Sequence, residues 1–349
     1  MVTIKDIAAK TGFSPTTISL VMNNRRLARY MSASTKKIVR ETAAKMGYRP
    51  NIFAQALRAR RSFMVGLLVY DILDPYCAPI VKEIEATLIP HGYTMLISDL
   101  GYDQNRYVEA LDILNWRRAD GIIAIANHFP NDLEALRKTA SITPVVVIGR
   151  VTGEKSVPCF VVNDRQGGYL AAQHLLELGH REIGIIWDHS RYQWSTLRWK
   201  GVEKAFAGVG LRIDPRNVFL IEDKSSDAGY SAANKLMAQN AKLTAICCVN
   251  DLTAIGAVRA VFDAGRSVPE DISVTGFDDL YLARHYNPPL STVAQPLDRL
   301  GQLATQTLLE RIAHPKRAMK GAILKPSLVA RRSTAPPAPN ARRSTTELR

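Results

Sequence analysis

The chain has 349 residues, of which 46% are hydrophobic, so it is long enough to bury a core in more than one domain. Its formal net charge of +14 lies at the two ends. Residues 1–62 hold 13 Lys and Arg against two acidic residues, and residues 313–349 hold nine against one, whereas the 250 residues between them hold 24 against 29. Because a merely solvated charged surface would mix the signs more evenly, this distribution favours a protein that binds a polyanion.

Two classes of protein are disfavoured at this stage. No apolar run approaches the roughly 18 residues that cross a bilayer, and the N-terminus lacks the apolar stretch of a secretory signal, so we expect a cytoplasmic protein with no membrane contact. The cysteines are spaced neither as a C-x-x-C pair nor as a zinc set, which predicts buried free thiols and no metal site. They are Cys77, Cys159, Cys247 and Cys248.

Residues 3–24, TIKDIAAKTGFSPTTISLVMNN, predict two short helices separated by a tight turn. Thr3 and Asp6 have the spacing of a capping box, and Gly12 can end the first helix. Ser14, followed by a proline at the first helical position, caps the second helix. This is the pattern of a helix-turn-helix unit.

A third helix is predicted from a cap at Ser32 to Tyr48, because two short helices bury too little surface to fold without further support. The residues expected to form the small core are Ile7, Ala8, Phe13, Ile18, Val21, Met22, Ile38, Val39 and Ala43.

Short side chains cover the outward face of the second helix and suit close approach to a DNA major groove. We expect Thr16 and Leu20 to contact bases, and Thr17 and Ser19 to contact phosphates or to cap the helix. The full outward set is Pro15, Thr16, Thr17, Ser19, Leu20 and Asn23.

Residues 48–62, YRPNIFAQALRARRS, predict a short helix that begins at Asn51 and is too short to be stable alone in water. Leu57 would share a face with Phe53 and Ala54, beside the cations of RARR. Such an apolar wedge can enter a minor groove. An ordinary interdomain linker is the alternative.

From Phe63 onward, short apolar runs alternate with helical spacings, which predicts two parallel sheets with crossover helices. The predicted strands lie in FMVGLLVY, YTMLIS, GIIAIA, PVVVIG, EIGIIW, VFLI, TAICCV and DISVTGF. Two doubly wound lobes bind ligands at the carboxyl ends of their strands, in the cleft between them.

Polar and aromatic residues follow these strands and can bind a small molecule. We expect Arg198 to make a two-pronged contact with a diol or carboxylate, and Asp278 to accept hydrogen bonds from hydroxyl groups. Tyr76 and Trp194 offer faces for a sugar or base ring. Helix capping is at least an equal alternative for Asp164, Asn250, Asp251 and Asp279. The candidates that follow strands are Asp74, Tyr76, Asn163, Asp164, the stretch from Trp187 through Arg198 (which includes Trp194), Asn250, Asp251, Asp278 and Asp279.

The sequence gives little support to an enzyme. It contains no G-x-G-x-x-G after the first strand, no phosphate-loop motif, no H-E-x-x-H and no G-x-S-x-G. His174 and His180 come nearest to a pair, and we interpret both as packed or solvated. We therefore expect no catalytic residues and no cofactor.

Residues 3–62 resemble the headpiece and hinge of the lactose-repressor/galactose-repressor (LacI) family of bacterial transcription regulators, through TIKDIAAKTGFSPTTISLVMN and Y-x-P-N-x-x-A-x-x-L. The resemblance implies that the second helix reads a palindromic operator and that Leu57 wedges into the minor groove at its centre. The residues expected to bind DNA are Thr3, Ser14, Pro15, Thr16, Thr17, Ser19, Leu20, Asn23, Asn51, Ala54, Leu57 and Arg58.

The resemblance extends to about residue 335, through segments such as HLLELGHREIGII, TAICCVND and VPEDISVTGFDD. It implies a two-lobed domain like periplasmic binding proteins, with a sugar, sugar derivative or nucleoside-like effector in the cleft. Cys77 stands where the family often has an aromatic residue, so no named ligand carries over. The residues expected to contact the effector are Asp74, Tyr76, Trp194, Arg198, Asn250, Asp251 and Asp278.

The predicted fold class is therefore α/β, with a three-helix headpiece and a hinge helix before the two lobes. The predicted boundaries are 1–50 for the headpiece, 51–61 for the hinge helix, 62–335 for the two-lobed domain and 336–349 for a tail. The Pro-rich, basic composition from residue 333 onward predicts disorder, which would begin just before this last boundary. The first lobe takes about 62–162 and 292–325, and the second about 163–291 and 326–335.

The predicted function is a transcriptional regulator, by resemblance a repressor, that binds double-stranded operator DNA as a homodimer under control of an effector. No C-terminal leucine heptad is present to make a tetramer. Three rivals stay open: a solute-binding protein of the same fold, an enzyme, and a regulator controlled by a partner protein.

Overall fold

The computed structural model describes residues 2–23, 26–48, 61–125, 133–149, 157–189 and 192–338. Contacts between residues divide the chain into two units, Met1–Ser62 and Phe63–Arg349.

Among the described residues of the first unit are three α-helices, and their N-terminal ends follow the predicted capping residues. In α1 (Ile4–Thr11), the Thr3 main-chain N–H donates to Asp6 Oδ2 at 2.8 Å and Asp6 N–H donates to Thr3 Oγ1, which completes the capping box. Gly12 ends this helix with a φ of 73°, a conformation that favours glycine. The remaining elements are α2 (Pro15–Met22) capped by Ser14, η1 (Arg26–Tyr30), and α3 (Ala33–Lys45) capped by Ser32.

The core of the first unit matches the predicted set except at one position. The fully buried residues are Ile7, Ile18, Val21, Val39 and Ala43, with Ala8, Phe13 and Met22 packed against them. Ile38 is 46% exposed, so its predicted place in the core is wrong. The buried face of α3 runs through Val39 and Ala43, and Ile38 lies about 100° around the helix from Val39.

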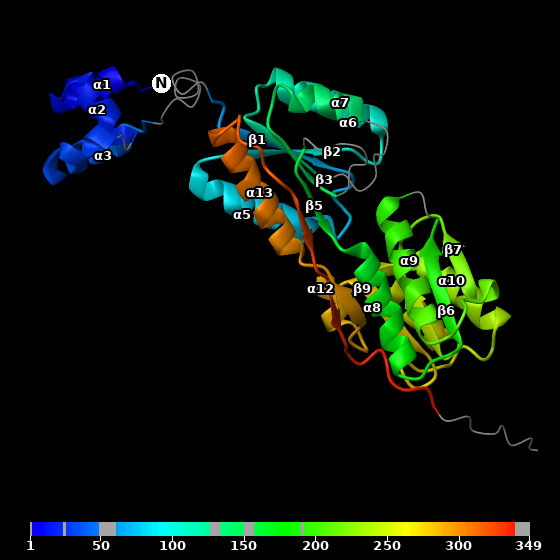
Figure 1. The fold of residues 1–349 in the computed structure, drawn as a ribbon. Coiled ribbons are helices and arrows are strands. Elements are labelled where there is room, and N and C mark those ends of the chain that lie inside the picture. Colours follow the sequence, from blue (N-terminus) through cyan, green and yellow to red (C-terminus); the bar gives the residue numbers. More distant parts are fainter. Residues whose placement is uncertain are drawn as a thin grey trace, which may run out of the picture. The chain divides into compact units, whose positions relative to one another are not determined.

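The second unit begins with a six-stranded sheet in the order β11-β5-β4-β3-β1-β2, in which every pairing is parallel. Its strands are β1 (Met64–Val69), β2 (Thr94–Asp99), β3 (Gly121–Ile125), β4 (Val145–Ile148), β5 (Cys159–Val162) and β11 (Ala322–Leu324). Two helices cover each face (Figure 1). They are α5 (Cys77–Leu88) with α13 (Leu297–Ala313), and α6 (Gln104–Trp116) with α7 (Leu133–Ala140); η2 (Ile89–His91) follows α5. We call these elements the first lobe.

The second lobe contains a sheet in the order β12-β10-β9-β8-β6-β7. Its strands are β6 (Ile183–Asp188), β7 (Val218–Ile221), β8 (Ala245–Cys248), β9 (Ser273–Asp278), β10 (Ser291–Ala294) and β12 (Ser327–Val329). The predicted parallel sheet is confirmed, and the one antiparallel pairing among the described strands is that of β12 with β10 at its edge. The helices are α8 (Asp164–Glu177), α9 (Gln193–Gly208), α10 (Ser226–Gln239), α11 (Asp251–Asp263) and α12 (Tyr281–His285), with η3 (Pro215–Asn217) before β7.

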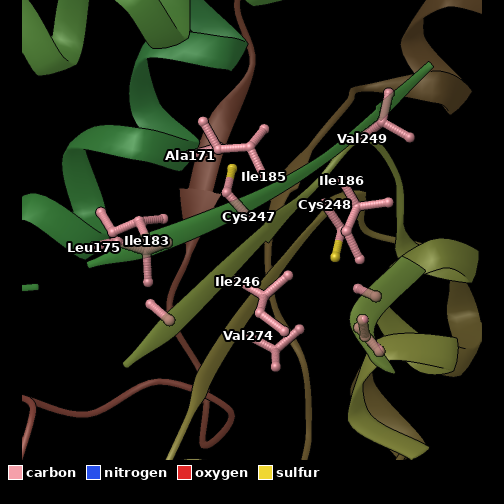
Figure 2. Packing of buried hydrophobic residues seen from close by; sticks show 14 of the residues in the cluster. Ala171, Leu175, Ile183, Ile185, Ile186, Ile246, Cys247, Cys248, Val249 and Val274 are labelled. Carbon is pink, nitrogen blue, oxygen red and sulfur yellow. The ribbon is translucent and has the colours of Figure 1, made fainter. Parts of the chain in front are cut away.

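The core of the second lobe follows from the alternation of side chains along its strands. Cys247 points toward α8, beside Ile185 and Ala171, whereas Cys248 points to the opposite face beside Ile186 (Figure 2). Both thiols are buried and free, as is Cys77, while Cys159 is half-buried. Burial raises the pKa of the Cys247 thiol to about 11, which keeps it protonated and unreactive.

The chain passes between the lobes three times: after β5, after β10 and between β11 and β12. The predicted return to the first lobe at about residue 292 falls inside β10, which pairs with β9 in the second lobe. The crossing therefore lies after Ala294. The prediction also omitted β5, β10, β11 and β12 from the strand list.

The residues that follow β12 are ordered against the second lobe, so the predicted disorder from residue 333 is wrong for 333–335. Ser333 is fully buried, and its hydroxyl donates to Val274 O at 2.6 Å. His180 Nε2 bonds Ala335 O at 2.9 Å, and His174 Nε2 bonds Thr334 Oγ1 at 2.8 Å. Both histidines thus pack against this segment. Residues 339–349 lie outside the described part of the chain.

Candidate functional site

The second helix of the first unit presents the side chains predicted to read bases. Pro15 and Thr16 are exposed at its start, and Leu20 is half-buried one turn later. Thr16 and Leu20 share a face because they are four positions apart. Because the side chains on this face are short, the helix can approach a DNA groove closely.

The other predicted DNA contacts of this unit lie at the surface and also stabilise the ends of the helices through hydrogen bonds. Ser14 accepts a hydrogen bond from Thr17 N–H at 3.1 Å, and the two hydroxyls lie 3.0 Å apart. Asn23 Nδ2 donates to Ser19 O at 2.7 Å. Thr3 caps α1. These groups stay at the surface, where a hydroxyl or amide can also contact a phosphate.

Four predicted DNA contacts lie outside the described residues. They are Asn51, Ala54, Leu57 and Arg58 of the predicted hinge helix.

In the second unit, the loops at the carboxyl ends of the strands from both lobes meet in one cleft. Asp74 and Tyr76 follow β1 in the first lobe. Arg198 lies on α9, Asn250 follows β8 and Asp278 ends β9, all in the second lobe. With Tyr70, Trp194 and Lys224, these residues line a small space of about 40 Å³, which we call the central compartment.

Arg198 is the buried cation of this compartment, with 6% of its surface exposed. Its Nε donates to Asp164 Oδ1 at 3.0 Å, and its Nη1 lies 3.9 Å from Asp278 Oδ1. The guanidinium also lies over the rings of Phe277, at 3.7 Å, and Trp194, at 4.6 Å. Several partners therefore fix the planar group in one orientation, as bidentate recognition of a ligand requires.

A glycine allows α8 to approach α9 where the arginine is held. A Cβ atom built on Gly168 would lie 1.9 Å from Arg198 O. Only glycine fits at this contact, so Gly168 allows α8 to pack directly against the main chain of Arg198.

Asp278 is the second buried polar group, with 7% exposed surface and a φ of 114°. Gln295 Nε2 donates to its Oδ1 at 2.6 Å. Burial raises the pKa of Asp278 to about 7, although Arg198, Gln295 and Lys224 oppose that rise and Asp74 adds to it. The carboxyl group can thus accept hydrogen bonds from a ligand above neutral pH and donate one below it.

The first lobe supplies an acceptor and an aromatic ring. Asp74 Oδ2 accepts from Tyr70 OH at 2.7 Å, and Asp74 Oδ1 accepts from Tyr76 N–H at 3.0 Å. These bonds fix the turn after β1. Tyr76 lines both the central compartment and a neighbouring space of about 40 Å³ near Gln295, which we call the hinge compartment.

Two predicted ligand contacts after β8 differ in their surroundings. Asn250 lines the central compartment, and it also caps α11 by accepting from Thr253 N–H at 2.9 Å. Asp251 is fully buried and does not face the compartment; its oxygens accept from Leu280 N–H at 2.8 Å and Thr292 Oγ1 at 2.5 Å. We correct its predicted role: Asp251 holds the loop after β9, next to Asp278.

The sequence analysis missed one charged residue of the cleft, Lys224, whereas Asp188 lies in the stretch 187–198 that it named after a strand. Lys224 follows β7, and its ammonium lies 4.8 Å from the Trp194 ring. Burial lowers its pKa, whereas Asp74, Asp188 and Asp278 act in the opposite direction. Asp188 ends β6 and accepts from the buried Ser195 hydroxyl, and burial raises its pKa. Lys224 follows the predicted strand VFLI, and this position was the signal that could have identified it as a cleft residue.

A third space shares lining residues with the central compartment and has a volume of about 480 Å³. We call it the outer compartment. It shares Asp74, Lys224 and Asn250 with the central compartment. Its other lining residues include Asp71, Tyr102, Asp188, His189, Tyr192, Glu222 and Asp223.

Two family matches cover most of both units. Residues 3–51 match bacterial regulatory proteins of the lacI family, and residues 172–334 match the periplasmic binding protein-like domain. The chain is 33% identical over 333 residues to the HTH-type transcriptional repressor PurR of Pasteurella multocida, which covers 95% of this chain and 98% of that protein. The chain belongs to the lacI family. The predicted family and fold class are confirmed, and the protein is a DNA-binding transcriptional regulator.

Solved structures of lacI-family proteins extend over nearly the whole chain. The Lac repressor dimer bound to operator and the anti-inducer ONPF matches 96% of this chain and 99% of that one, with a TM-score of 0.81 at 26% identity. The transcriptional regulator CelR in complex with cellobiose matches 95% and 100%, with a TM-score of 0.71 at 27% identity. Both cleft and headpiece thus have counterparts in known structures.

Two further observations concern the chemistry open to this lacI-family chain. Within the part of the chain that the structure describes, no group of three or more His, Cys, Asp and Glu side chains could hold a metal ion. No helix among the described residues is long and apolar enough to span a membrane.

Proposed function

We propose that the protein is a repressor that acts in the cytoplasm and binds a palindromic operator as a homodimer. The named relative is a transcriptional repressor, and the Lac repressor neighbour is a dimer on its operator. One headpiece buries too little surface for high specificity, so two headpieces on a palindrome give the required discrimination. The cationic residues of 1–62 supply the attraction to phosphates.

Within this proposal, Thr16 and Leu20 read bases with Pro15 beside them, and Thr3, Ser14, Thr17, Ser19 and Asn23 position the headpiece on the backbone. The exposure of Pro15 and Thr16 supports this division. The hinge contacts come from Asn51, Ala54, Leu57 and Arg58, with Leu57 as the wedge.

We retain the proposed domains 1–50, 51–61 and 62–335, with the interlobe crossing moved to follow Ala294. The tail is limited to the residues after 335, because 333–335 pack on the second lobe.

The effector that the cleft fits best is a sugar or sugar derivative. The observation that carries this proposal is the pairing of a fixed Arg198 guanidinium with the buried Asp278 carboxyl in a compartment that aromatic side chains also line. Polyols offer hydroxyl groups to both charges and an apolar ring face to Tyr76 or Trp194. The CelR neighbour holds cellobiose, which agrees with this class of ligand.

Control of DNA binding follows if the ligand favours one arrangement of the lobes. A ligand shifts an equilibrium only by its differential affinity for the two states, so a ligand that touches both lobes has the required leverage. Asp74 and Tyr76 from the first lobe, with Arg198 and Asp278 from the second, supply such contacts.

The test measures operator binding by fluorescence anisotropy with and without sugars. An operator is first selected from random duplexes, and the purified dimer is then titrated with it in the presence of each sugar. We expect at least one sugar to change the operator affinity by about 5- to 150-fold. In the Asp278→Ala variant, operator binding stays and the sugar response disappears. If sugar changes the operator affinity of the Asp278→Ala variant as much as that of the wild type, the proposed effector site is contradicted.

A further inference from the structure

A groove with a volume of about 630 Å³ lies in the second lobe, between α9, the sheet edge at β6 and β7, and the segment that joins α9 to β7. We call it the lateral groove. It shares no lining residue with the central, hinge or outer compartment. Its volume falls within the range of about 300–1,000 Å³ that small-molecule sites span.

The position of β7 at the edge of the sheet explains why the groove exists. Leu220 pairs with Trp187 of β6, and it shares a face of β7 with Val218 because side chains alternate along a strand. This face lies on the side of α9, whose Trp199 ring contacts Trp187 at 5.7 Å. Leu220 remains 48% exposed. The apolar face of β7 is therefore one wall of the lateral groove.

The aromatic residues of the groove present apolar surface to an occupant. Trp187 is 1% exposed, and its Nε1 donates to Ser195 Oγ at 3.1 Å. Trp199 Nε1 donates to Glu203 Oε1 at 2.9 Å. Since both indole N–H groups have acceptors within the protein, neither requires a polar partner on a ligand. Phe206 adds a third ring, so the groove fits a flat apolar group.

The charged residues of the lining are Glu203 and Arg212. Glu203 already accepts the hydrogen bond from Trp199. Arg212 is exposed, and it makes no hydrogen bond or ion pair with another residue in the described part of the chain. A guanidinium without a partner beside an apolar groove favours a ligand that carries a carboxylate next to its ring.

The lateral groove is connected to the cleft through β6 and α9. Ser195 accepts the Trp187 hydrogen bond and donates its own proton to Asp188 Oδ1. Asp188 lines the outer compartment. On α9, Trp199 directly follows Arg198, the buried cation of the central compartment. A ligand that moves Trp187 or α9 would therefore move charged groups of the cleft.

We propose that the lateral groove is a second effector site, which binds an aromatic monocarboxylate and changes the affinity for DNA through α9. Binding in the groove is independent of the proposed sugar effector. The effect on DNA rests on the proposed control of DNA binding by the cleft. The two sites together would let the protein combine two chemical signals.

Calorimetry with the full-length protein tests ligand binding with three probes that share one ring system: naphthoate, the neutral naphthamide and the cationic naphthylmethylammonium. We expect naphthoate to bind with a Kd below about 1 mM. It should bind at least about threefold tighter than naphthamide, because one partly exposed charge pair contributes about that much, and the cation should bind most weakly.

Variants locate the probe in the groove. Ala207 is an exposed residue of α9 that lines the groove, so Ala207→Phe should fill the space and abolish naphthoate binding. Arg212→Gln should reduce naphthoate affinity to within about twofold of that for naphthamide. Arg216→Gln is the matched control, since Arg216 lies on the same segment but bonds Asp214 Oδ2 at 2.7 Å. Equal thermal midpoints show that the variants are folded.

Anisotropy titrations with the selected operator test the effect on DNA. Saturating naphthoate should change the operator affinity of the wild type by at least about fivefold, the lower end of typical coupling between sites. The Ala207→Phe variant should show no such change. Asp278→Ala should keep the naphthoate response, so that failure of the sugar site and failure of the lateral groove give different results.

Four results overturn the proposal. They are the absence of naphthoate binding up to about 10 mM, naphthoate binding that persists in Ala207→Phe, tighter binding of the cation than of naphthoate, and an operator affinity that saturating naphthoate leaves unchanged. Persistence in Ala207→Phe would place the probe in the cleft. A lower oligomeric state of Ala207→Phe in sedimentation would also overturn the proposal, because the groove would then be a contact between copies of the chain.

Discussion

Replacing Asp278 by Asn should change how the stability of the protein depends on pH. The Asp278 carboxyl group is buried, and desolvation raises its pKa from 3.8 to about 7. Between these two values the folded protein holds a proton that the unfolded chain has released. The contribution of Asp278 to the free energy of unfolding therefore falls as pH rises from about 4 to 7, and it is constant above about 7. An asparagine lacks this titration.

The magnitude follows from the size of the shift. Each pH unit within the window changes the free energy of unfolding by about 1.4 kcal/mol. From pH 5 to pH 8, the stability of Asp278→Asn relative to the wild type should therefore rise by about 3 kcal/mol. Other titrating groups cancel to first order because both proteins contain them. The pH-independent cost of replacing a carboxyl by an amide beside Gln295 cancels as well.

Urea denaturation at several pH values measures this difference. Trp187, Trp194 and Trp199 all lie in the second lobe, so tryptophan fluorescence reports chiefly on the part that contains Asp278. Both proteins are compared at one protein concentration because the proposed dimerisation would contribute to stability. A stability difference that stays flat from pH 5 to pH 8, or that falls, refutes a carboxyl group protonated by burial.

The remaining predictions concern DNA binding and the support of the cleft. Leu57→Ala should weaken operator binding by at least about tenfold while the dimer stays folded, and unchanged affinity in anisotropy titrations would remove the proposed wedge. Thr16→Ala or Leu20→Ala should change the preferred base at one operator position, with a cost of about 1–3 kcal/mol for the original base; a uniform loss across sequences would assign these residues to the backbone. Gly168→Ala should destabilise the second lobe by about 1–3 kcal/mol and weaken sugar binding by displacing Arg198, because the added Cβ meets Arg198 O. Gly208→Ala, with no atom within 4 Å of the built Cβ, is the matched control, and equal thermal midpoints for the two variants would contradict the packing argument.

Local rules were sufficient to predict the helix ends of the first unit. The capping box at Thr3 and the left-handed conformation of Gly12 depend on neighbours within three or four residues, and both are confirmed. The position of Ile38 depends on which side of α3 meets the other helices. Sequence periodicity left that choice open by one position, and the apolar Ile38 was assigned to the wrong side.

Some residues of the cleft could likewise be predicted from the local sequence, whereas others depend on tertiary contacts. Arg198 and Asp278 follow strands, so the fold class and the family resemblance together placed them in the compartment. Asp251 also follows a strand, but its carboxylate turns to Leu280 N–H and Thr292, which are distant in sequence. Lys224 enters the cleft because β7 lies at the edge of the sheet next to β6, a pairing that no local pattern reveals.

Competition binding is the most direct test of the central claim, which is that the cationic first unit recognises a specific duplex and that the cleft controls it. The purified dimer is titrated with its selected palindrome and with random duplex at about 150 mM salt. We predict that the palindrome binds at least about 1,000-fold tighter than the random duplex. Equal affinity for the two, with and without sugars, would contradict the account.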